Sequence, residues 1–91
     1  MPAVLEAVEE VIQAELHLQR AEGRPLKLAF DAVARALGVT PRRVRAYHHH
    51  EVSEDDVRAK EWIAAQALRE RRRAAEVARA RAILASSGEA A

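Results

Sequence analysis

The chain has 91 residues, of which 49% are hydrophobic by type, 32% are charged and none is cysteine. A chain of this length forms one small domain with a modest core, and the lack of cysteine excludes disulfides, thiolate metal sites and a cysteine nucleophile. Its formal net charge of +1 conceals four blocks of alternating sign. Residues 1–22 hold five acids and one base, residues 23–50 six bases and one acid, residues 51–61 five acids and two bases, and residues 62–91 six bases and three acids. We therefore expect two basic surfaces on the folded protein.

Hydropathy and composition also bear on where the protein acts. No apolar run approaches the roughly 18 residues that a membrane span requires, and the first ten residues already contain three glutamates. We expect neither a membrane span nor a signal peptide. The absence of cysteine fits the cytoplasm, which is the location we predict.

Strong helix formers dominate the chain and no alternating strand pattern is present, so we expect an all-α fold. The first helix is predicted over Ala3–Glu22, with Pro2 at its start. At about 100° per residue, its large apolar side chains share one face and its glutamates occupy the other. The apolar face consists of Val4, Leu5, Val8, Val11, Ile12, Leu16 and Leu18. This amphipathic helix must pack on the rest of the fold.

Gly23-Arg24-Pro25 interrupts the helical pattern and begins a connector that we expect to extend through Leu28. A second helix is predicted over Ala29–Leu37. Gly38 follows, and glycine readily takes the left-handed conformation that ends a helix.

A third helix is predicted to begin at Thr40 and Pro41, which suit the capping and first helical positions, and to extend to about His50. Val44 and Tyr47 are three residues apart and should face inward. The arginines of this helix are expected to point away from the core; they are Arg42, Arg43 and Arg45.

The run Ser53-Glu54-Asp55-Asp56 resembles a capping box and predicts the start of a long helix that continues to about Ala85. A helix of this length spans about 50 Å, which exceeds the width of so small a globule. Part of it must therefore project or pack against another chain. We divide the chain into a helical domain over residues 1–68 and an extension over residues 69–91, whose tail from Ser86 we expect to fray.

The segment Phe30–His49 resembles the twenty-residue helix-turn-helix of bacterial and phage DNA-binding proteins, without pointing to one family. Apolar, small or glycine residues occupy seven of the expected places: Val33, Ala34, Leu37, Gly38, Val39, Val44 and Tyr47. A small residue is needed at Ala34 because the second helix of the motif crosses just above it. Gly38 permits the steep turn between the helices. Tyr47 departs from the usual aliphatic residue.

This resemblance implies a DNA-binding protein, either a transcriptional regulator or a phage-like accessory factor, whose partner is double-stranded DNA. The helix Thr40–His50 would enter the major groove. The residues predicted to contact DNA are Thr40, Arg42, Arg43, Arg45 and His49, flanked by Arg35 and Lys27. A homodimer would read a two-fold symmetric site. The alternative is a protein–protein adaptor that docks an acidic partner through the same basic hairpin.

Two further patterns leave alternatives open. Neighbouring residues on a helix diverge by about 100°, so His48–His50 cannot share a metal ion; they either end the helix or contact phosphate or base. The arginines over Arg69–Arg81 spread around the helix, and form a solvated surface, non-specific phosphate contacts or a docking arm. Trp62 is expected in the core or at a dimer contact.

Catalytic patterns are missing from the sequence. It contains no glycine-rich phosphate loop, no His-x-x-x-His pair and no supported Ser–His–Asp arrangement. We therefore expect no enzyme activity, catalytic residue, metal, cofactor or small-molecule ligand.

Overall fold

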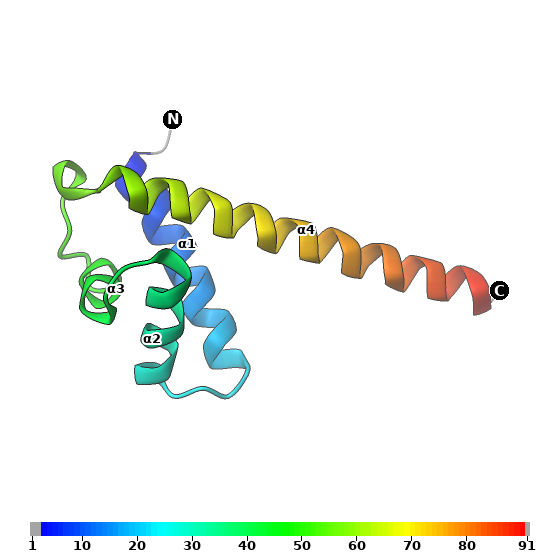
Figure 1. Ribbon diagram of the computed structural model, residues 1–91. Helices are drawn as coiled ribbons and strands as arrows, with labels where there is room; N and C mark the ends of the chain where they lie inside the picture. The colour runs from blue at the N-terminus through cyan, green and yellow to red at the C-terminus, as the bar shows by residue number, and fades with distance from the viewer. Residues whose placement is uncertain (1–2, 91) are drawn as a thin grey trace.

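The computed structural model describes residues 3–90, and all regular structure within that range is helical (Figure 1). The elements are α1 (Val4–Ala21), α2 (Leu26–Leu37), α3 (Pro41–His48), a 3-10 turn η1 (Glu54–Asp56) and α4 (Ala59–Ala90). The predicted all-α class is confirmed. The expected helix start at Pro2 and the terminal Ala91 lie outside the described residues.

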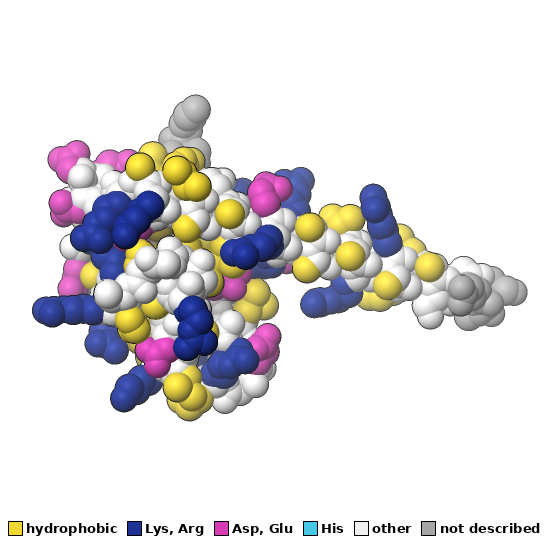
Figure 2. All heavy atoms as spheres, viewed as in Figure 1, with side chains coloured by type: hydrophobic (Ala, Val, Ile, Leu, Met, Phe, Trp, Pro, Cys, Tyr) yellow, Lys and Arg dark blue, Asp and Glu magenta, His cyan; other side chains and the backbone are white. Residues whose placement is uncertain are grey.

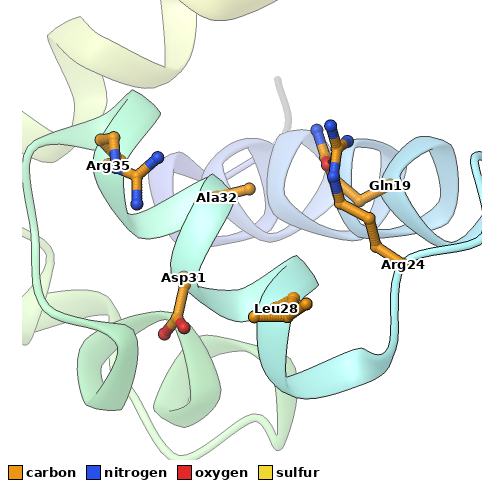
Figure 3. A pocket seen from close by; sticks show the side chains of 6 residues that line it. All are labelled: Gln19, Arg24, Leu28, Asp31, Ala32 and Arg35. Carbon is orange, nitrogen blue, oxygen red and sulfur yellow. The ribbon is translucent and has the colours of Figure 1, made fainter.

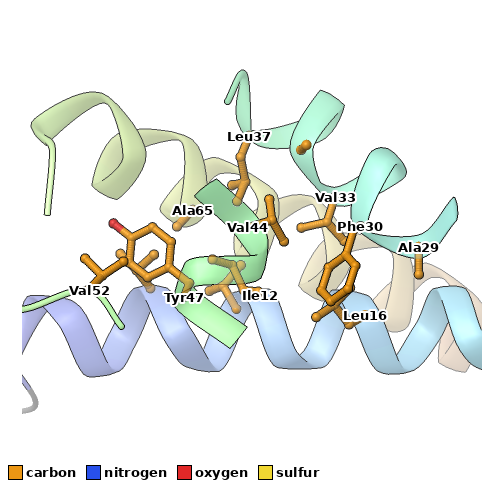
Figure 4. Packing of buried hydrophobic residues seen from close by; sticks show 13 residues of the cluster. Ile12, Leu16, Ala29, Phe30, Val33, Leu37, Val44, Tyr47, Val52 and Ala65 are labelled. Atoms are coloured by element: carbon orange, nitrogen blue, oxygen red, sulfur yellow. The ribbon is translucent and has the colours of Figure 1, made fainter. Parts of the chain in front are cut away.

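The core lies where α1, α2 and α3 meet the first turns of α4 (Figure 4). The largest completely buried apolar side chains are Val8, Ile12, Val33, Val44 and Tyr47. Ala65 contributes from α4 and is completely buried. Trp62 is half-buried against this cluster, in agreement with its predicted place at the core.

The start of α2 lies three residues earlier than predicted. The helix begins at Leu26 because Pro25 occupies the N-cap with an extended backbone, and its carbonyl accepts the amide of Ala29 at 2.9 Å. Leu26 and Leu28 are exposed, at 42% and 52%. The first turn therefore lacks the buried stripe that would have revealed it as helix.

The long helix α4 begins later than predicted. Ser53 starts only the short turn η1, where its hydroxyl donates to the carboxylate of Asp56 at 2.9 Å, and the extended backbone of Val57 then breaks the helix. The start of α4 is instead marked by Glu61, whose carboxylate accepts the backbone amide of Arg58 at 3.0 Å. This contact is one half of a capping box. The helix also continues past the predicted end at Ala85, as far as Ala90.

Glu54 caps α1 across the fold. Its two carboxylate oxygens accept the backbone amides of Val4 and Leu5 at 3.0 and 3.1 Å. A negative charge at this point complements the positive end of the helix dipole. Part of the acidic block over residues 51–61 therefore stabilises the N-terminus of α1.

The second half of α4 leaves the globular body and projects as an arm (Figure 1). Every residue from 73 to 88 is exposed, and the molecule measures 54 × 33 × 18 Å. The expectation that part of this helix projects is confirmed. Over residues 3–90, none of the helices combines the length and the hydrophobicity that a membrane span requires.

Candidate nucleic-acid interface

The turn between α2 and α3 has the conformation that the sequence predicts. Gly38 is left-handed, with φ 70° and ψ 32°, and the amide of Val39 donates to the carbonyl of Ala34 at 3.0 Å. Thr40 then caps α3, where its hydroxyl oxygen accepts the amide of Arg43 at 3.2 Å. Pro41 is the first helical residue. Glycine and proline thus allow α3 to begin with only three residues between it and the end of α2.

The inward faces of the two helices also agree with the predicted pattern. Val33, Ala34 and Leu37 are buried in α2, and Val44 and Tyr47 are buried in α3. Ala34 is 2% exposed, which leaves room for the close approach of α3. This packing fixes α3 rigidly against α2.

On its outer side, α3 presents two arginines to solvent. Arg42 and Arg45 are exposed, as is Thr40 at the start of the helix. The guanidinium of Arg45 lies 5.3 Å from the ring centre of Phe30, which orients the side chain without burying it. Around α2 and α3, several basic side chains stand on the visible surface among apolar and a few acidic ones, and further acidic side chains gather near η1 (Figure 2).

Arg43 does not point outward, so its predicted outward orientation is wrong. Its Nε donates to Glu61 Oε2 at 2.7 Å, and its Nη2 donates to Glu61 Oε1 at 2.9 Å and to the carbonyl of Asp56 at 2.6 Å. The ion pair raises the pKa of Arg43. Only 18% of its side chain is exposed. Arg43 therefore ties α3 to the start of α4.

Glu61 is the centre of this arrangement and is 1% exposed. Besides Arg43, it accepts the hydroxyl of Tyr47 at 2.6 Å and the amide of Arg58 at 3.0 Å. Burial alone would raise the pKa of Glu61, but these hydrogen bonds outweigh it and lower the pKa to about 2. Burial and the adjoining carboxylate raise the pKa of Tyr47. The buried carboxylate thus stays ionised and holds three parts of the chain together.

The three histidines diverge, as the helical geometry requires. His48 is half-buried, with Nδ1 3.0 Å from Gln13 Oε1 and its ring 5.4 Å from that of Phe30. Burial and the neighbouring histidines lower the pKa of His48. His49 is exposed, and His50 lies 2.8 Å from the carboxylate of Glu9. Among the described residues, no group of three His, Asp or Glu side chains is arranged to hold a metal ion.

His50 also has an unusual backbone. Its φ is 59°, the left-handed conformation that Gly38 takes at the end of α2. The amide of Glu51 donates to the carbonyl of Ala46 at 2.9 Å, which closes the end of α3. A histidine therefore occupies a position that favours glycine, and the helix ends two residues before the predicted limit.

The flanking residues Lys27 and Arg35 are both exposed, as a DNA backbone contact requires. Arg35 lines a shallow depression of about 280 Å³ between α1 and α2, which also contains the acidic Asp31 (Figure 3). At its other end, Arg24 hydrogen-bonds to Gln19 and pairs with Glu22. The positive charge of this flank is thus partly neutralised by neighbouring acids.

Of the arginines in α4, Arg72 is engaged with the body, where it pairs with Glu15 at 2.6 Å. The others between Arg69 and Arg81 are exposed. They do not form one stripe, and they lie mostly on the projecting arm.

No protein-family model matches the chain, and comparisons with curated proteins and with solved structures likewise give no match.

Proposed function

We propose that this protein binds double-stranded DNA by inserting α3 into the major groove, and that it acts in the cytoplasm as a transcriptional regulator or phage-like accessory factor. The observation that supports this most is the exposed pair Arg42 and Arg45. They lie three residues apart on a helix held rigidly by the turn at Gly38. Residues at this spacing share one helix face, so both guanidinium groups can reach the same stretch of groove.

The proposed roles follow from side-chain chemistry. Arg42 and Arg45 can bind the O6 and N7 atoms of guanine with two hydrogen bonds or clamp a phosphate. His49, Arg35 and Lys27 are exposed and would contact the flanking backbone. Arg43 takes no direct part in this proposal, because it holds α3 in place through Glu61. Neither catalysis nor a cofactor is part of the proposed function.

Binding of a random duplex at several salt concentrations, measured by fluorescence anisotropy, tests the proposal. Affinity should fall steeply as salt rises, because phosphate contacts release counterions. The double variant Arg42→Ala/Arg45→Ala should weaken binding more than tenfold. Its control is Arg79→Ala/Arg81→Ala, which removes the same charge from exposed positions on the arm. Equal affinities for the two double variants would contradict the assignment of α3.

Absence of any salt-dependent DNA binding would instead favour the adaptor function. In that case the same exposed arginines would dock an acidic protein. Reduced affinity for such a partner in Arg42→Ala/Arg45→Ala would then identify the surface.

We also propose that α4 mediates a homodimer. Apolar side chains lie exposed along it, namely Ile63 at 66%, Ile83 at 60% and Leu84 at 71%. Ile63 is therefore an apolar group without a partner in the described fold. Two copies would read half-sites about 34 Å apart or a multiple of that distance. Sedimentation equilibrium should give twice the chain mass of 10.1 kDa, and the change Leu84→Asp should return it to the single-chain value.

A further inference from the structure

A second depression, of about 360 Å³, lies beside the start of α3. Its lining comes from two separate parts of the chain. One part is the turn together with α3, which contributes Thr40, Arg42, Arg43 and Ala46. The other part is Arg58, the residue that directly precedes α4. Arg58 lies outside the helix-turn-helix segment and is not among the DNA contacts predicted from the sequence.

The buried carboxylate of Glu61 explains why Arg58 lies there. Glu61 accepts the backbone amide of Arg58 at 3.0 Å and the guanidinium of Arg43 at 2.7 Å. Arg43 in turn donates to the carbonyl of Asp56 at 2.6 Å. The backbone just before α4 is therefore fastened to α3, and this fixes the Cα atom of Arg58 at the edge of the depression.

The charged side chains that line the depression are all positive. Three guanidinium groups line it, and Glu61 neutralises that of Arg43. Arg42 and Arg58 are exposed, and within the described residues neither side chain forms an ion pair or a side-chain hydrogen bond. Thr40 accepts the amide of Arg43, which leaves its hydroxyl hydrogen available as a donor. Two cationic groups and one hydroxyl thus remain available to an anion.

The shape of the site favours an oxyanion that belongs to a larger molecule. Ala46 lines the depression with a small side chain that takes up little of its volume, and Arg42, which also lines it, is exposed on α3. A phosphodiester needs such charged donors on one side and free passage for the chain on the other.

We propose that Arg42, Arg58 and Thr40 form a phosphodiester site, which binds a backbone phosphate of duplex DNA next to the groove entered by α3. This inference rests on the proposed function and adds Arg58 as a DNA contact from outside the two motif helices. A phosphate contact fixes the position of the protein on the duplex and carries no sequence information.

The test compares Arg58→Gln with Lys60→Gln in duplex binding over a range of salt concentrations. Lys60 is a matched control because it is exposed, carries the same charge and lies two residues away, outside the depression. Arg58→Gln should lower the magnitude of the salt slope by about one and weaken binding about eightfold at roughly 0.1 M salt, on all sequences alike. Lys60→Gln should bind like the original protein.

Each result bears on a separate conclusion. If Arg58→Gln binds duplex as tightly as Lys60→Gln, the phosphodiester site is overturned while DNA binding by α3 stands. If the unaltered protein binds no duplex at all, the proposed function fails, and this site fails with it as a DNA contact. Both variants should retain their circular dichroism and melting temperature, because only the backbone of Arg58 takes part in the contacts of the fold.

Discussion

Replacing Glu61 with glutamine should destabilise the fold. The loss of free energy depends on how deeply the carboxylate is buried and on how far its pKa is lowered. The carboxylate is 1% exposed and its pKa is about 2, against an ordinary value of 4.5. At about 1.4 kcal/mol per pKa unit, this difference corresponds to about 3 kcal/mol of folding free energy at neutral pH. Loss of one member of a buried ion pair costs a similar amount, about 3–5 kcal/mol, because the remaining charge of Arg43 is left poorly compensated.

The contribution of Glu61 to the free energy of unfolding should depend on pH. The pKa of Glu61 is lower in the folded protein than in the unfolded chain. The stabilisation is therefore complete above about pH 4.5 and is lost as the pH falls toward about 2, where the folded protein must also take up the proton. Glutamine cannot titrate, so the Glu61→Gln variant should lack this part of the acid-induced loss.

Urea unfolding and thermal unfolding, both followed by far-UV circular dichroism at several pH values, measure both effects. At pH 7 the melting temperature of Glu61→Gln should fall by roughly 12–24 °C. The control Glu51→Gln alters an exposed glutamate between α3 and η1 and should change little. If Glu61→Gln does not fold, Tyr47→Phe removes only the 2.6 Å hydrogen bond and should cost about 1 kcal/mol. A Glu61→Gln variant as stable as the original at pH 7 would refute the reasoning.

Three other substitutions test separate features. Gly38→Ala should cost roughly 1–2 kcal/mol in urea unfolding, because φ is 70° and no neighbouring atom lies within 4 Å of the added carbon, so any loss is conformational. His50→Gly should raise the melting temperature, since φ 59° suits glycine and the exposed contact with Glu9 contributes little; a lower melting temperature would contradict this. The free energy of unfolding should decline as the pH falls below about 6.5, because His48 resists protonation in the folded protein while the unfolded chain takes up the proton. The variant His48→Gln should show a smaller decline between pH 7.5 and pH 5.5. A decline equal to that of the original protein would exclude His48 as the cause.

The parts of the fold that local chemistry controls could be predicted from the sequence. Gly38 and Thr40-Pro41 define the turn because their backbone preferences act within a few residues. The spacing of Val44 and Tyr47 likewise fixed which side of α3 is buried. Such signals need no knowledge of the tertiary structure.

The orientation of Arg43 could not be predicted in this way. On a helix it lies next to the buried stripe, about 40° from Tyr47, so it can turn either to solvent or to the core. Its partner Glu61 is 18 residues away, across a turn and an extended segment. Glu61 itself carried a usable local signal, since an acid three residues into a helix often caps the start. The nearby Ser53 offers a competing capping pattern, which predicts too early a start for α4. For that reason the sequence gives Arg58 no distinct role.

The arm formed by α4 owes its helical form to the globular body. Residues 73–88 bury nothing against the described fold, and a free peptide of that length would be only marginally helical in water because the first turn is costly to form. In this protein the helical turns around Ala65 are already fixed in the core. Each further residue of α4 therefore adds a backbone hydrogen bond, and no new helix has to be nucleated. Unwinding should therefore proceed inward from Ser86, Ser87 and Gly88, which are weaker helix formers than the alanines before them. In a single copy, such as the Leu84→Asp variant, amide protons near the tip should exchange with solvent long before those of the body, and removal of the arm should leave cooperative unfolding of the core intact.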